Sequence, residues 1–118
     1  MKPLLLASAL ILALVLPAAA QEMKMDHGAM ATDSAATTAY KAANMDMHSA
    51  MEIDYSGDAD IDFVRGMIPH HQGAIAMAKI VLEHGADPEI KKLAQEIITA
   101  QESEIAWMQD WLTKHPAK

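Results

Sequence analysis

The stretch DIDFVRGMIPHHQGAIAMAKIVLEH, residues 60–84, decides the fold. Its apolar residues recur at intervals of three and four, which is the spacing of one face of an α-helix. Acidic residues at its start suit the positive end of the helix dipole, and Gly85 follows it as a helix terminator. The apolar stripe, which we expect to face the core, comprises Phe63, Met67, His70, Ala74, Met77 and Val81, with His71 and Ala78 along its flank.

Two further helical patterns flank this stretch. Residues 35–53 carry one, with Asp33 or Ser34 placed to cap it. Residues 88–113 carry the other, with Asp87 as its cap and a proline in its first position. One face of the earlier pattern gathers Tyr40, Asn44, Met47 and Met51.

The predicted fold is all-α, because no stretch shows the alternation of a strand. Short connections impose antiparallel neighbours, so we expect a small up-down bundle of three core helices. Three helices make a thin core, and dimerisation into a homodimer would complete it. Pro69 lies inside the second pattern, where it predicts a kink or a split of that helix.

The first twenty residues have the features of a secretory signal peptide. Lys2 gives a basic start, residues 4–16 are almost entirely apolar, and residues 18–20 are the small alanines that a signal peptidase requires. We therefore expect export, to the periplasm or the cell exterior. The apolar run is shorter than the roughly 20 residues that span a bilayer, so we expect no stable membrane insertion after cleavage.

Three segments follow from these patterns: a signal peptide at residues 1–20, a flexible tail rich in Met and His at residues 21–34, and a helical metal-binding domain at residues 35–118. The net charge of −7 disfavours nucleic acid, whose binding depends on Lys and Arg. It suits a protein that binds cations.

The composition gives the first indication of function. The chain has ten methionines and six histidines but no cysteine. Methionine fills irregular cores, so a soft core is one interpretation. Thioether sulfur is also a soft ligand that favours Cu(I) and persists in an oxidising compartment, so a copper site is the other.

On the predicted second helix, His70 points at the core. Met67 lies one turn before it, His71 lies beside it, and Met77 lies two turns after it. Ala74 leaves room above the ring. A lone inward histidine is more often a hydrogen-bonded core residue, but imidazoles and thioethers converging on one space are the ligands expected for Cu(I), or for Ag(I) as its mimic.

The predicted third helix adds Met108 to this core site, and its apolar stripe is interrupted by Gln101 and Glu104. An inward carboxylate needs a partner, because burying it unpaired costs roughly 2 to 7 kcal/mol. The ring N–H of His70 or His71 would provide one and would be oriented for metal binding. The alternative is that Glu104 pairs at the surface with a residue such as Lys41, or extends its carboxylate into water.

Two weaker groups of candidate ligands lie elsewhere. On the first helix Met47, His48 and Met51 are spaced to meet one ion, although for this helix taken by itself packing is the better account of the methionines. The tail has no core to fill, so its sulfur and imidazole groups predict a separate site of lower affinity. The tail candidates are Met23, Met25, His27 and Met30.

The run Met67-Ile68-Pro69-His70-His71 leads to a resemblance. Together with Ala74, Met77 and Ala78, and with the later Gln101, Glu104-Ile105, Met108 and Trp111-Leu112, it resembles the domain-of-unknown-function family numbered 305 over about residues 40–112. The resemblance implies a ferritin-like helical bundle, export, and copper binding and resistance. The tail, with its Met25-Asp26-His27-Gly28-Ala29-Met30 run, is expected to lie outside the family domain. The Glu-x-x-His pairs of di-iron bundles are missing, so iron oxidation is not expected.

We expect an exported copper-binding protein that sequesters or transfers Cu(I) in copper resistance or homeostasis, and not an enzyme. The expected partners are the metal ion and a copper-exporting or copper-oxidising protein. Two alternatives stay open. One is an enzyme in which His70 or His71 performs acid–base chemistry with Glu104. The other is a metal-free helical interaction module whose methionine stripe packs against a partner.

Overall fold

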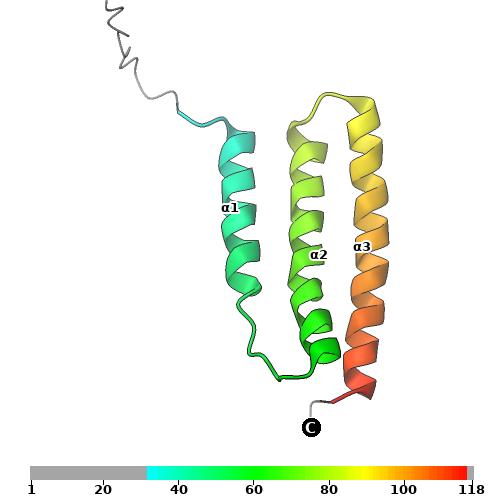
Figure 1. Ribbon diagram of the computed structural model, residues 1–118. Helices are drawn as coiled ribbons and strands as arrows, with labels where there is room; N and C mark the ends of the chain where they lie inside the picture. Colours follow the sequence, from blue (N-terminus) through cyan, green and yellow to red (C-terminus); the bar gives the residue numbers. More distant parts are fainter. Residues whose placement is uncertain (1–31, 117–118) are drawn as a thin grey trace, which may run out of the picture. The chain divides into compact units, whose positions relative to one another are not determined.

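The computed structural model describes residues 32–116, and this part of the chain is all-α as predicted. It consists of three helices: α1 (Ala35–Ala50), α2 (Ala59–His84) and α3 (Pro88–Lys114). Consecutive helices run antiparallel, as Figure 1 shows. The bounds follow the sequence pattern closely, except that α1 ends at Ala50 rather than at residue 53.

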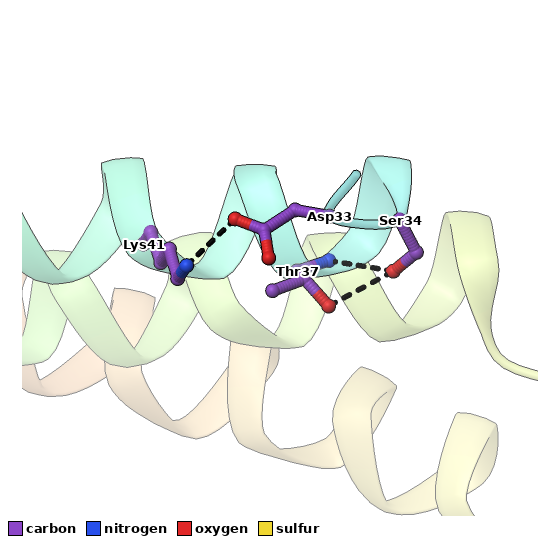
Figure 2. Close-up of polar contacts among 4 residues, drawn as sticks. All are labelled: Asp33, Ser34, Thr37 and Lys41. Atoms are coloured by element: carbon purple, nitrogen blue, oxygen red, sulfur yellow. Dashed lines mark hydrogen bonds and ion pairs between the residues drawn. The ribbon is translucent and has the colours of Figure 1, made fainter. Parts of the chain in front are cut away.

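Side-chain caps fix where each helix begins. The Ser34 hydroxyl accepts the backbone N–H of Thr37 at 3.1 Å, so Ser34 and not Asp33 caps α1 (Figure 2). The Asp33 carboxylate instead accepts a 2.6 Å hydrogen bond from the ammonium group of Lys41. Lys41 is therefore already paired on α1.

The two longer helices also have acidic caps. The Asp58 carboxylate accepts hydrogen bonds from the backbone N–H groups of Asp60 and Ile61, the second and third residues of α2. Asp87 caps α3 as predicted, and a proline takes its first turn.

Pro69 does not split α2, so that part of the prediction is wrong. The helix is continuous from Ala59 to His84 and Pro69 is one of its buried residues. Proline removes one backbone donor from a helix. Here α2 is held by packing against a neighbour on each side, and that packing keeps the helix in one piece.

The middle helix, α2, contacts both others, whereas α1 and α3 do not contact each other within residues 32–116 (Figure 1). The described helices therefore form a single layer. The buried cluster lies between α2 and α3, and none of the large side chains described is fully buried. The members of that cluster are Ile75, Ala78, Ala94 and Ile98.

This arrangement contradicts the prediction that the whole apolar stripe of α2 faces the core. Val81 packs against the buried cluster and Ala78 is part of it, but three stripe residues are exposed. Phe63 is 65% exposed and Met77 is 41% exposed, and His70 is also exposed. The physical reason is that α1 and α3 occupy opposite sides of α2. Gly73 faces α1, His71 faces α3, and the stripe lies in the open sector between the two contacts.

The contact between α1 and α2 depends on the absence of a side chain at Gly73. A Cβ atom there would lie 2.7 Å from Cγ and 3.0 Å from Cβ of Met47. Both separations are shorter than the normal packing distance between carbon atoms. The thioether of Met47 is thus held against the backbone of α2 as a packing group.

Replacing Gly73 with Ala should lower the free energy of unfolding by about 1 kcal/mol. The overpacking of Met47, which costs about 1–3 kcal/mol, exceeds the roughly 1 kcal/mol that Ala contributes to a helix interior. Gly66→Ala is the matched control, because its Cβ would meet only Ile53 Cδ1 at 3.9 Å. That variant should gain stability. Urea denaturation measures both, and equal effects would contradict this account of the contact.

The connection between α1 and α2 is organised by Asp62. Its carboxylate accepts the backbone N–H of Ser56 at 2.7 Å, the Ser56 hydroxyl at 2.8 Å and the backbone N–H of Gly57 at 3.1 Å. The Ser56 backbone hydrogen bond is the largest cause that lowers the pKa of the Asp62 carboxyl from its ordinary 3.8.

Replacing Asp62 with Asn should reduce stability at neutral pH, and the loss should shrink in acid. Because the pKa of Asp62 is lower in the folded state, its contribution is fully present above the unfolded value of 3.8 and is lost as pH falls through the folded value. Unfolding curves at several pH values measure the difference between the two proteins. A difference that stays constant down to the most acidic condition would rule out the carboxylate as its source.

Candidate metal centre

A hollow of about 330 Å³ lies between α2 and the C-terminal half of α3. It brings together one imidazole, one carboxylate and two thioethers. Each helix supplies two of these four groups, from residues four apart in the sequence. Met67 and His71 come from α2, and Glu104 and Met108 come from α3. The remaining lining residues are Phe63, Val64 and Trp107.

The central group is His71. Its residue is only 8% exposed, and its Nε2 atom lies 2.5 Å from Oε2 of Glu104. The Glu104 side chain is 60% exposed, so it reaches from the rim of the hollow to the ring. A carboxylate hydrogen-bonded to one ring nitrogen is the arrangement that orients metal-binding histidines.

The other ring nitrogen of His71 has no partner. Nδ1 is buried and makes no hydrogen bond. When Nε2–H donates to the carboxylate of Glu104, Nδ1 carries a lone pair that nothing in the described structure satisfies. Leaving a buried acceptor unpaired costs about 1–3 kcal/mol. A metal ion at Nδ1 would remove that cost.

The structure corrects which histidine points inward. His71 is buried between α2 and α3, whereas His70, the predicted core histidine, is exposed. Their ring centroids are 6.1 Å apart and their planes are tilted by 60°. Consecutive helical residues differ by about 100° in direction, so only one of the pair can face α3.

Glu104 takes the first of its two predicted partners. It bonds to His71, and Lys41 is paired with Asp33 instead. Its carboxylate is at the rim rather than inside as expected. Gln101, one turn earlier, is half-buried.

Met108 and Met67 lie where the sequence placed them. Met108 is 5% exposed, Met67 is half-buried, and both line the hollow with His71. Met77 does not join them. It lies ten residues after Met67, about 15 Å along the helix, and lines a second hollow of about 300 Å³ with Tyr40 and Ile90.

The candidate ligands of α1 are not brought to this centre. Met47 packs against Gly73 on the side of α2 away from α3. His48 and Met51 are exposed. The tail candidates Met23, Met25, His27 and Met30 lie outside the described residues.

Two aromatic residues at the rim were not assigned to the site from sequence. Phe63 was expected in the core and Trp107 was not considered, yet both line the hollow and are largely exposed. The available signal was spacing. Trp107 lies one turn after Glu104, and Phe63 lies one turn before Met67.

Within residues 32–116, no three His, Asp or Glu side chains gather as a metal site. The hollow offers His71 with Met67 and Met108, which is a soft donor set.

None of the three helices combines the length and apolar character needed to cross a bilayer.

One curated relative shares part of the sequence. The chain is 48% identical over 46 residues to the uncharacterized protein L153 of Acanthamoeba polyphaga mimivirus. The alignment covers 39% of this chain and 30% of the relative, so the chain matches about a third of that protein's length.

A family model matches much more of the chain. Residues 12–112 match the family described as domain of unknown function (DUF305). The match starts inside the predicted signal peptide and includes residues 21–34, so the expectation that the tail lies outside the family domain is wrong. Because the match covers most of the sequence, the chain belongs to the DUF305 family.

Proposed function

We propose that this protein is an exported copper-binding protein that sequesters or transfers Cu(I) in copper resistance or homeostasis. The observation that carries the proposal is the environment of His71. Its Nε2 is hydrogen-bonded to Glu104, its buried Nδ1 has no partner, and two thioethers line the same hollow.

The donors in this hollow favour a soft ion. Thioether sulfur selects Cu(I), and imidazole also suits copper. In the proposed site His71, Met67 and Met108 hold the ion, with Ag(I) as its mimic, and Glu104 orients the ring. A bound Cu(I) ion would accept the lone pairs of the unpartnered nitrogen and of the sulfur atoms.

Binding is favoured over acid–base catalysis by the same ring. A general base must reach a proton on its substrate. One nitrogen of His71 is engaged by Glu104, and the other is buried away from solvent.

The rest of the proposal concerns the protein's surroundings. The tail candidates at residues 23–30 would capture ions at lower affinity and pass them to the buried site. Export to the periplasm would place the protein beside a copper-exporting or copper-oxidising partner. The negative charge of the chain would help it collect cations there.

Replacing His71 with Ala should weaken the tight Cu(I) site by at least about 100-fold. His70→Ala is the matched control and should change affinity by less than about twofold, because the adjacent ring points away from the hollow. A competition titration with a colorimetric Cu(I) chelator measures both. Met108→Leu, which keeps the core volume, should also weaken binding, and unchanged affinity in this variant and in His71→Ala would refute the site.

Replacing Glu104 with Gln should weaken Cu(I) binding by about 10- to 100-fold, the usual effect of losing the carboxylate that orients a ligand histidine. Glu102→Gln removes the same charge from an exposed position on the same helix and should leave affinity unchanged. If both variants weaken binding equally, general electrostatic attraction and not orientation of His71 is responsible.

A further inference from the structure

One face of the helix layer is apolar and uncovered. The stripe of α2, Phe63 to Val81 at intervals of three and four, has no charged side chain. Both hollows are lined by stripe residues, so both open on this face. The opposite face of α2 carries Arg65, Lys79 and Glu83. The two faces of α2 therefore differ in polarity: one is apolar, and the other carries charged side chains that suit contact with water.

The uncovered face extends onto the neighbouring helices. Tyr40 of α1 and Ile90 of α3 line the second hollow, and Trp107 of α3 lines the first. Ile90 and Trp107 are exposed. Apolar side chains from all three helices thus line the two hollows on this side of the layer, which we call the stripe face.

We propose that a second copy of this chain covers the stripe face, with the two α2 helices antiparallel across a two-fold axis. Domains are built from two packed layers, and the described part of the chain supplies one layer with no large side chain fully buried. A second layer would turn the stripe face into a core.

The lack of charge on the α2 stripe fits a second copy as the occupant. Two chains with a net charge of −7 repel each other over most of their surfaces. Along the α2 stripe itself they can meet without placing like charges opposite each other, and the carboxylate of Glu104 lies outside the stripe, at the rim of the first hollow. A membrane surface is a poorer occupant, because anionic lipids attract basic residues and the stripe has none.

The size of the face is sufficient. A helix of 26 residues is about 40 Å long, and three helices at 8–10 Å spacing are roughly 25 Å across. The face therefore covers about 1,000 Å² per copy, compared with the roughly 800 Å² per partner of a stable interface.

Two-fold symmetry sets the pairing along α2. An interface of this kind is isologous, so residue pairs repeat on both sides of the axis. An axis at the middle of the stripe places Met67 opposite the partner subunit's Met77. It also matches large residues with smaller ones, Phe63 with Val81 of the partner subunit and His70 with Ala74 of the partner subunit.

This pairing gives the copper site a further thioether. Within one chain Met77 lies about 15 Å from Met67, but in the dimer the partner subunit's Met77 adjoins the hollow of His71. The partner would also cover Phe63 and Trp107 at the rim and exclude water. This ligand role rests on the proposed function, whereas the dimer does not.

The dimer is tested by sedimentation velocity on the exported protein in metal-free buffer. The wild type should sediment as a dimer, and Met77→Glu as a folded monomer, because residue 77 is already 41% exposed in a single chain. Lys79→Glu, on the opposite face, is the matched control and should stay dimeric. Circular dichroism checks that all three remain helical.

The outcomes separate the possible occupants. A dimer that survives Met77→Glu would refute the stripe face as the interface. A wild-type monomer would refute the second copy. Trp107 shielded from a quencher in that monomer would assign the face to residues 21–31, which remain after signal cleavage. Trp107 accessible to the quencher would assign the face to another protein.

The register is tested with cysteine pairs, because the chain has no cysteine of its own. Phe63→Cys with Val81→Cys places two thiols about 27 Å apart on one helix, too far for an internal disulfide. Mild oxidation should give a covalent dimer of this double variant and none of Phe63→Cys alone. A covalent dimer of the single variant would indicate parallel α2 helices and refute the proposed pairing.

The ligand role of Met77 is tested separately with Met77→Leu, which keeps the apolar interface but removes sulfur. This variant should remain dimeric and bind Cu(I) at least about tenfold more weakly. Unchanged affinity in a dimer would refute the role of the partner subunit's Met77 and leave both the dimer and the His71 site standing.

Discussion

The placement of α1 and α3 on opposite sides of α2 is the constraint on which the rest of the structure depends. It directs Gly73 toward one neighbour and His71 toward the other. It also leaves the stripe between these two contacts without cover. The packed contact with Met47, the hollow that contains His71 and the apolar face are thus three consequences of one arrangement of helices.

The His71–Glu104 pair links the surface of the molecule to its interior. The carboxylate is at the rim and the ring is buried, so the hydrogen bond crosses the boundary between water and the core. Water solvates most of the charge on Glu104, which reduces the cost of its position. The ring is held in one orientation without a buried charge, and its buried second nitrogen makes no hydrogen bond.

Local features of this fold could be predicted from sequence, and features that depend on distant contacts could not. Asp87 was identified as a cap because capping involves only neighbouring residues. The partner of Glu104 was found because an interrupted apolar stripe demands a donor. The prediction that His70 rather than His71 faces the core was wrong. The two side chains differ by about 100° in direction around α2, and the positions of α1 and α3 determine which of them is buried. Met77 failed for a different reason, because it lies about 15 Å along α2 from Met67 and lines the second hollow.

The unequal burial of the methionines has a chemical consequence. Oxidation converts a thioether to a polar sulfoxide and removes its softness as a ligand. Met108 is nearly inaccessible, whereas Met45 and Met77 are open to solvent in a single chain. Peroxide and similar oxidants would therefore consume the outer sulfur atoms first. The fold thereby shields the Met108 sulfur atom in the hollow of His71, and the exposed methionines react before it.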